Sequence, residues 1–242
     1  MNHNRIKALL FLLLLSTCLP AQETKRNPYH LNIISSTQAY TGQIHKDSLK
    51  LLIDLHKAVP GIVLDIRYAT TNNFTNKRVY TSARAFARLR VAEALALVQK
   101  ELQAMGLGLK VFDAYRPYAA TLLFWDIIHD TAYVASPATG SRHNRGCAVD
   151  VSLVNLKTGK ELQMPTPFDD FTPKASPAYQ QIPEIAKQNR QLLINIMSKY
   201  GFTVYSSEWW HFDYKNAKRY PVLDLPFSSV ESKNEKKRPG CS

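Results

Sequence analysis

The chain has 242 residues, of which 45% are hydrophobic and 21% are charged. These values are ordinary for a soluble globular protein of one large or two small domains, and they exclude a largely disordered chain. The net charge of +12 would suit an anionic partner. Much of that charge lies near the two ends, and no arginine-rich helix or nucleic-acid motif accompanies it, so we expect no nucleic-acid partner.

The first 21 residues have the pattern of an export signal. A positive start, MNHNRIK, precedes the apolar run ALLFLLLLSTCL, and PAQ offers a small residue for cleavage after Ala21. The run is too short to favour a retained transmembrane anchor. In a second interpretation, LSTC is a lipoprotein cleavage site and Cys18 carries a lipid anchor. Both interpretations place the protein outside the cytoplasm, in the periplasm or cell envelope.

The next segments predict a linker and the start of a folded domain. Residues 22–45 are polar and lack periodicity, which is typical of a linker, and the domain is expected over residues 46–228. SLKLLIDLHKA is a short amphipathic segment, and IVLDIRYA, after a Pro-Gly break, predicts a strand over 62–69. Apolar residues at helical spacing predict a long helix over 84–105.

Strands and helices then alternate loosely. GLKVFDAY predicts a buried strand over 108–115, a helix begins at Pro117, and CAVDVSLV predicts a strand over 147–154. Residues 155–179 hold four prolines and form a long irregular loop, which in a compact domain is functional or disordered.

The last elements are a helix and two strands. The helix is expected over 182–201, and the strands are FTVY and EWWHFDY. Residues 229–242 complete the chain as a mobile basic tail. Together the elements predict a single α+β domain.

Two segments, SRHNRGCAVD and EWWH, hold candidate metal ligands. In an exported protein with few cysteines, histidine and carboxylate are the available zinc ligands. His143, Asp150 and His211 would supply the three protein ligands of a catalytic zinc, and Glu208 would be free to act as general base. Taken singly, each residue has a simpler interpretation as a solvated loop, capping or strand residue, so only the combination favours a metal site.

Arg116 and Cys147 each have more than one interpretation. Arg116, in DAYRP, follows a predicted strand and could stabilise an oxyanion, or it could form a structural salt bridge with Asp113. Cys147 could be a small packed group, a disulfide partner of Cys241, or a thiol whose pKa neighbouring arginines lower. We favour the packed group.

These motifs carry a family resemblance. SRHNRGCAVD matches the S-x-H-x-x-G-x-A-x-D pattern of zinc D,D-peptidases, and with DAYRP upstream and EWWH downstream the chain resembles the D-alanyl-D-alanine dipeptidases of the VanX type. LDIRYATTNNFTN and PTPFDDF also resemble segments of that family. The resemblance therefore runs from about residue 50 to about residue 225.

The resemblance implies a small antiparallel sheet flanked by helices, as in lysostaphin-type peptidases and the hedgehog signalling domain. It implies one Zn²⁺ per chain, held by His143, Asp150 and His211. Glu208 would take a proton from the attacking water and pass it to the leaving amine, and Arg116 would stabilise the tetrahedral gem-diolate.

The resemblance also implies substrate contacts. Tyr68 and Asp169 match positions that hold the free amino group of the substrate, and Ser141 matches a hydroxyl that lines the pocket. A carboxylate that captures an ammonium group disfavours blocked substrates because these leave it unpaired. Arg142 and Cys147 depart from the pattern, since the family often has small hydroxyl residues there, and this puts the polarity of the pocket in question.

The implied activity is hydrolysis of a small D,D-dipeptide, D-alanyl-D-alanine, in the turnover of cell-wall fragments. Two alternatives stay open. A D,D- or L,D-carboxypeptidase or endopeptidase would act on longer peptidoglycan peptides, and Asp169 and Tyr68 distinguish it from a dipeptidase. A non-catalytic zinc- or wall-binding module would need no base beside the metal, so Glu208 and Arg116 argue against it.

Overall fold

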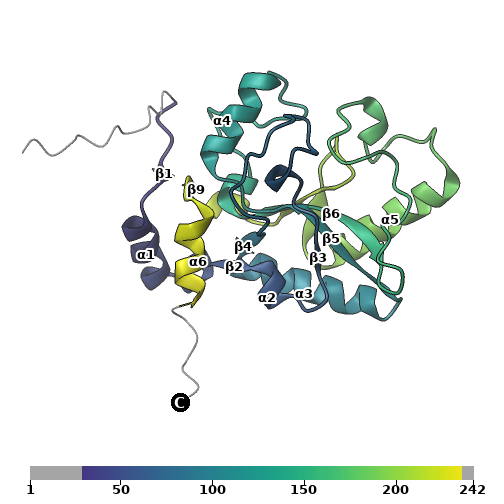
Figure 1. The fold of residues 1–242 in the computed structure, drawn as a ribbon, viewed down its shortest axis with the longest axis horizontal. Coiled ribbons are helices and arrows are strands. Elements are labelled where there is room, and N and C mark those ends of the chain that lie inside the picture. The colour runs from purple at the N-terminus through teal and green to yellow at the C-terminus, as the bar shows by residue number, and fades with distance from the viewer. Residues whose placement is uncertain (1–28, 236–242) are drawn as a thin grey trace, which may run out of the picture.

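A five-stranded sheet forms the centre of the fold in the computed structural model, which describes residues 29–235 (Figure 1). The strand order is β3-β5-β6-β8-β7; all neighbours are antiparallel except β3 and β5, which are parallel. The strands are β3 (Val63–Leu64), β5 (Leu107–Asp113), β6 (Ala148–Asn155), β7 (Phe202–Val204) and β8 (His211–Tyr214). The predicted α+β class with a small, mainly antiparallel sheet is confirmed.

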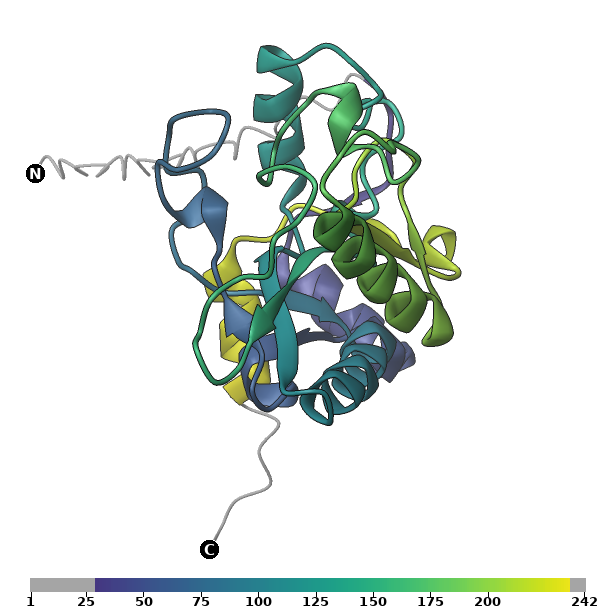
Figure 2. The ribbon, with the colours of Figure 1, turned by 90° about the vertical axis from the view of Figure 1, so that its right-hand side faces the viewer.

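Helices lie on both sides of this sheet. α3 (Leu89–Gln103) packs against β5, α5 (Glu184–Lys199) packs against α3 and the other edge of the sheet, and α4 (Tyr118–Ile127) lies above the sheet (Figures 1 and 2). α3 buries Val91, Leu95, Val98 and Leu102, whose spacing of three or four residues makes one apolar face. No helix within residues 29–235 is long and apolar enough to cross a membrane.

The predicted start of the long helix at residue 84 is wrong. Residues 86–88 instead form the strand β4 (Phe86–Arg88), which pairs antiparallel with β2 (Leu52–Asp54). The helical spacing of the apolar residues continues through this segment, but pairing with a distant strand overrides it. The amphipathic segment before residue 59 is likewise divided between β2 and the one-turn helix α2 (Leu55–Ala58).

The predicted linker is folded where the structure describes it. β1 (Ile33–Ile34) runs parallel to β9 (Val222–Leu223), and α1 (Thr37–Lys46) buries Tyr40 and Ile44 against the domain. These two side chains, four residues apart, are the only buried ones of α1. The rest of its sequence is mostly polar, so the helical spacing of apolar residues is hard to detect. The linker prediction is therefore wrong for residues 33–45.

The predicted mobile tail also begins too early. α6 (Phe227–Glu235) continues past residue 228, packs against β2 and buries Val230 completely. The remaining tail with Cys241, and the predicted export signal with Cys18, lie outside the described residues.

The long loop between β6 and α5 is irregular, as predicted, apart from a short 3₁₀ turn at Pro173–Ala175 and one bridge between Val154 and Glu161. Two tryptophans next to β8 contact this loop and hold it against the sheet. Trp209 donates its indole N–H to Thr166 Oγ1 at 2.9 Å, and the Trp210 ring lies edge-on to Phe168. The loop is thereby held as part of the domain.

Gly146 makes the turn before β6 possible, and its replacement tests this. It has φ +68°, and an added Cβ would lie 2.5 Å from Cδ2 of the fully buried Leu52. Gly159 has φ +69° but nothing within 4 Å, so Gly159→Ala carries only the backbone strain. We expect Gly146→Ala to lower the free energy of unfolding in urea by about 1–3 kcal/mol more than Gly159→Ala does. Equal losses would show that the packing around Gly146 is not tight.

Candidate metal centre

The register of three neighbouring strands places acidic and imidazole side chains in one row. Asp113 at the end of β5 lies opposite Asp150 of β6, and Asp150 lies opposite His211 at the start of β8. Directly opposed residues of an antiparallel pair project from the same face of the sheet. The row therefore follows from strand pairing alone.

A buried turn before β6 adds the second histidine. His143 begins a 3₁₀ turn, and its backbone N–H donates to Ser141 Oγ at 3.1 Å. The Asn144 amide accepts from the Ser141 N–H at 2.7 Å and donates to the Arg116 carbonyl at 2.9 Å. Asn144 is fully buried and ties the turn to the segment that follows β5. Sequence inspection did not identify it.

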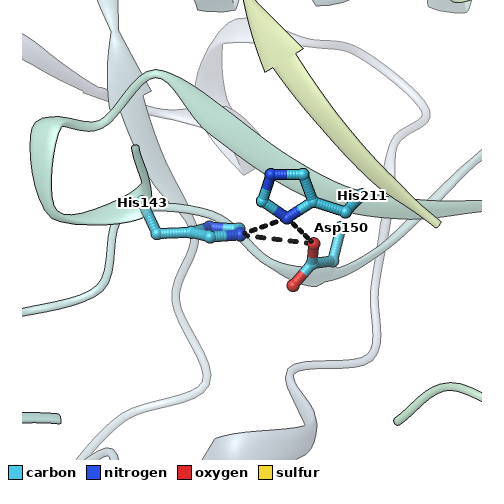
Figure 3. A group of neighbouring side chains, drawn as sticks. All are labelled: His143, Asp150 and His211. Atoms are coloured by element: carbon cyan, nitrogen blue, oxygen red, sulfur yellow. Dashed lines mark hydrogen bonds and ion pairs between the residues drawn. The ribbon is translucent and has the colours of Figure 1, made fainter. Parts of the chain in front are cut away.

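Three donor atoms meet in a triangle. His143 Nε2 lies 3.0 Å from His211 Nδ1 and 3.3 Å from Asp150 Oδ1, and His211 Nδ1 lies 3.1 Å from the same oxygen. Figure 3 shows the three side chains pointing toward one another from the turn, β6 and β8. Donors about 2.0–2.1 Å from a tetrahedral zinc ion are separated by about 3.3 Å, which is close to these distances.

The chemistry of the donors also suits a cation. Asp150 Oδ1 is buried and accepts no hydrogen bond, which is costly for a carboxylate oxygen unless a cation neutralises it. Within residues 29–235, this is the one group of three such side chains whose donor atoms lie within 4.8 Å of one another. The residues present therefore fit a zinc ion.

Outer hydrogen bonds select which nitrogen of each imidazole faces the triangle. His143 Nδ1 lies 2.7 Å from the Ala114 carbonyl, and His211 Nε2 lies 3.0 Å from Asp213 Oδ1. Each of these nitrogens donates its proton outward, so the other nitrogen keeps its lone pair for a metal. Asp213 was also missed, although residues two apart on a strand share a face, and that spacing could have identified it.

The electrostatics of the cluster favour positive charge at its centre. Burial acts to raise the pKa of Asp150, but the neighbouring His143 and His211 outweigh it and hold this pKa well below its usual range. Burial acts to lower the pKa of His211, but the close carboxylates of Asp150 and Asp213 outweigh it and raise this pKa to about 10. Both shifts express the same attraction between the carboxylates and a cation.

Glu208 and Arg116 border the triangle. Glu208 is 6% exposed, burial raises its pKa to about 8, and its Oε2 lies 3.7 Å from His211 Nδ1. Arg116 donates from Nε and Nη2 to Asp113 Oδ2 at 2.9 and 2.8 Å. The salt bridge weighed as a structural alternative is thus present. It also fixes the guanidinium, whose Nη2 lies 3.7 Å from Asp150 Oδ2.

Tyr68 and Asp169 form a second polar pair in the same cavity. The Tyr68 hydroxyl donates to Asp169 Oδ1 at 3.0 Å, and Asp169 Oδ2 is buried without a partner. Burial, followed by the charge of Asp150, raises the pKa of Asp169 to about 8. Asp169 has φ +63°, a left-handed conformation that is uncommon for a residue with a side chain. Its free oxygen can accept from a ligand.

One cavity of about 260 Å³ contains the whole arrangement. It is smaller than the roughly 300–1,000 Å³ pockets that take drug-sized ligands, and it suits a small substrate. All the residues predicted to form the site line it: Tyr68, Arg116, Ser141, His143, Asp150, Asp169, Glu208 and His211.

Cys147 lies apart from this cavity as a packed thiol, and it has no disulfide partner among residues 29–235. Burial raises its pKa to about 12 despite the opposing charges of Arg88 and Arg145. The neighbouring arginines therefore do not make it a reactive thiolate. Its proposed disulfide partner, Cys241, lies outside the described residues.

A family profile and two sequence relatives point to one family. The family profile described as D-ala-D-ala dipeptidase matches residues 48–233. The chain is 37% identical over 177 residues to a D-alanyl-D-alanine dipeptidase of Escherichia coli K12, covering 73% of this chain and 91% of that protein. It is 35% identical over 179 residues to a D-alanyl-D-alanine dipeptidase of Enterococcus faecium, covering 65% and 88%. The solved LD-carboxypeptidase LdcB aligns with 75% of this chain and 77% of its own at 19% identity and a TM-score of 0.41.

Removal of a single ligand tests the metal centre. We expect the parent protein to retain one zinc ion per chain after dialysis, and His143→Ala and His211→Ala to retain almost none, because two remaining donors hold zinc far more weakly than three. Elemental analysis of dialysed protein measures this. His129→Ala, at an exposed residue outside the triangle, is the control. Zinc retention by all three variants would contradict the assignment.

Proposed function

The chain belongs to the D-ala-D-ala dipeptidase family, and we propose that it hydrolyses D-alanyl-D-alanine to two molecules of D-alanine as a zinc peptidase. One observation carries the proposal: a buried carboxylate oxygen of Asp169 without a partner shares a small cavity with a three-donor metal triangle. A free ammonium group and a scissile amide would thus be bound together.

The chemistry divides between the metal and the protein. A zinc ion held by His143, Asp150 and His211 would supply a Lewis acid that polarises a carbonyl group and acidifies water. The Glu208 carboxylate takes a proton from the attacking water and delivers it to the nitrogen of the leaving D-alanine. Arg116 donates to the substrate oxygen that becomes negative as the carbonyl carbon turns tetrahedral. The contacts of Arg116 with Asp113 support this role because they restrict its guanidinium before substrate binds.

Tyr68 and Asp169 select the substrate by its free amino group. Asp169 accepts from the substrate ammonium through its unpaired oxygen, and the Tyr68 hydroxyl holds the other oxygen in place. An N-blocked peptide would leave the buried carboxylate without a donor, which favours dipeptides over longer chains. Ser141 lines the cavity beside these groups, as expected of a pocket hydroxyl.

Replacement of the base separates metal binding from catalysis. We expect Glu208→Gln to keep one zinc ion per chain but to lower kcat for D-alanyl-D-alanine by about 10²–10⁴-fold, the range expected for loss of a general base. Release of D-alanine and zinc content are measured on the same preparation, with the exposed Glu184→Gln as control. Undiminished turnover in Glu208→Gln would refute the role of the base.

Asp169 discriminates the dipeptidase from a carboxypeptidase or endopeptidase. We expect the parent to hydrolyse D-alanyl-D-alanine and to reject its N-acetyl derivative, and Asp169→Ala to narrow that difference by at least about 10-fold because the buried unpaired carboxylate is gone. Rates with both substrates, and with a wall tetrapeptide, are compared. If the parent hydrolyses the free and the acetylated substrates equally, the longer-peptide alternative gains.

We further propose that the protein acts outside the cytoplasm, in the turnover of cell-wall fragments. The pattern of residues 1–21 supports export, with either cleavage after Ala21 or a lipid anchor at Cys18. These residues lie outside the described part of the chain. Fractionation of cells that produce the full chain should recover a processed form from the periplasm or envelope. Full-length protein confined to the cytoplasm would contradict this.

A further inference from the structure

A second arginine, Arg142, lines the active-site cavity together with Arg116. His211 turns its Nδ1 toward the ligand triangle and its Nε2 toward Asp213 Oδ1, and the second oxygen of Asp213 lies 3.2 Å from Arg142 Nη1. On the other side, the Arg116 guanidinium lies 5.4 Å from the Tyr68 ring. A chain of contacts therefore runs across the cavity in this order: Asp169, Tyr68, Arg116, Asp150, His211, Asp213, Arg142.

Arg142 combines a fixed backbone with an available side chain. Its carbonyl accepts from the N–H groups of Arg145 at 3.1 Å and Cys147 at 3.0 Å, in the turn that also carries His143. Its side chain is 48% exposed and lines the cavity. Within the described part of the chain, only Nη1 of this guanidinium has a partner, so Nε and Nη2 remain for a ligand.

The other arginine of the cavity is already engaged. Arg116 uses Nε and Nη2 for Asp113, is 8% exposed, and its remaining donor is the one that we assign to the oxygen of the scissile carbonyl. Among the described residues that line the cavity, Arg116 and Arg142 are the two arginines and there is no lysine. A substrate carboxylate that needs a charge-assisted contact therefore has Arg142 as its partner.

We propose that Arg142 binds the C-terminal carboxylate of the substrate and thereby selects peptides with a free C-terminus. The proposal rests on the proposed function and extends it to the second charged end of a zwitterionic dipeptide. Asp169 receives the ammonium group, Arg142 receives the carboxylate, and the scissile amide lies between them at the ligand triangle. Asp213 contacts one nitrogen of the Arg142 guanidinium and so restricts its orientation. The other donors of the guanidinium stay available to the substrate carboxylate.

The test compares two substrates that differ only at this end, D-alanyl-D-alanine and D-alanyl-D-alaninamide. We expect the parent to prefer the free acid, and Arg142→Met to raise KM for the acid about 10-fold while kcat and the kinetics with the amide change little. The factor is at the low end for a charge-assisted hydrogen bond because the side chain is half-exposed. Arg142→Lys, which keeps the charge, should restore part of the preference.

A matched control separates loss of this contact from loss of any nearby positive charge. Lys215 lines the neighbouring surface cavity together with Arg142 but does not line the active-site cavity. Lys215→Met should therefore leave the preference for the acid unchanged. Zinc content is measured on each variant, because Arg142 also contacts Asp213. If Arg142→Met slows both substrates equally, the residue only supports Asp213 and the proposal is wrong.

Binding measurements distinguish failure of this proposal from failure of the proposed function. Calorimetry on Glu208→Gln reports substrate affinity without turnover, and the same measurement is made with Arg142→Met added. If Glu208→Gln binds acid and amide equally, the carboxylate contact is refuted even where the parent hydrolyses the dipeptide. If the parent hydrolyses no D,D-dipeptide but Arg142→Met still weakens binding of the acid, the proposed function fails and the carboxylate contact stands.

Discussion

Burying a carboxylate costs several kcal/mol unless cations and hydrogen bonds surround it, and Asp150 is buried between two imidazoles with an oxygen that accepts no hydrogen bond. The rest of the site is arranged around that oxygen. His143 and His211 approach it within 3.3 and 3.1 Å, and their outward hydrogen bonds fix the nitrogens that face it. Such a group of donors favours a cation at its centre.

The surrounding structure keeps the donors at these distances. Pairing of β5, β6 and β8 sets the row of Asp113, Asp150 and His211, and the buried amide of Asn144 ties the turn of His143 to the segment that follows β5. The tryptophans between Glu208 and His211 anchor the long loop, so the same short segment carries the predicted base, a predicted ligand and the contacts that hold the loop of Asp169. The site is therefore built on strands and buried turns, which limits its motion.

Sequence patterns located the candidate site better than they located the boundaries of the elements. The predicted ligands and the predicted base lie in short motifs that do not depend on the secondary-structure prediction, and the structure brings all of them to one cavity. Periodicity failed at residues 84–88, where strand pairing overrides a helical pattern, and in α1, where two buried side chains leave almost no pattern. Asp213 and Asn144 act through hydrogen bonds to other site residues, and sequence spacing gives only weak signals for such contacts.

Diffraction at the zinc absorption edge from crystals of zinc-loaded protein would locate the metal. We expect one anomalous peak per chain, bonded at about 2.0–2.2 Å to His143 Nε2, Asp150 Oδ1 and His211 Nδ1, with Glu208 beside it but not bonded to it. A peak at any other group of side chains, or one that Glu208 coordinates in place of Asp150, would contradict this assignment.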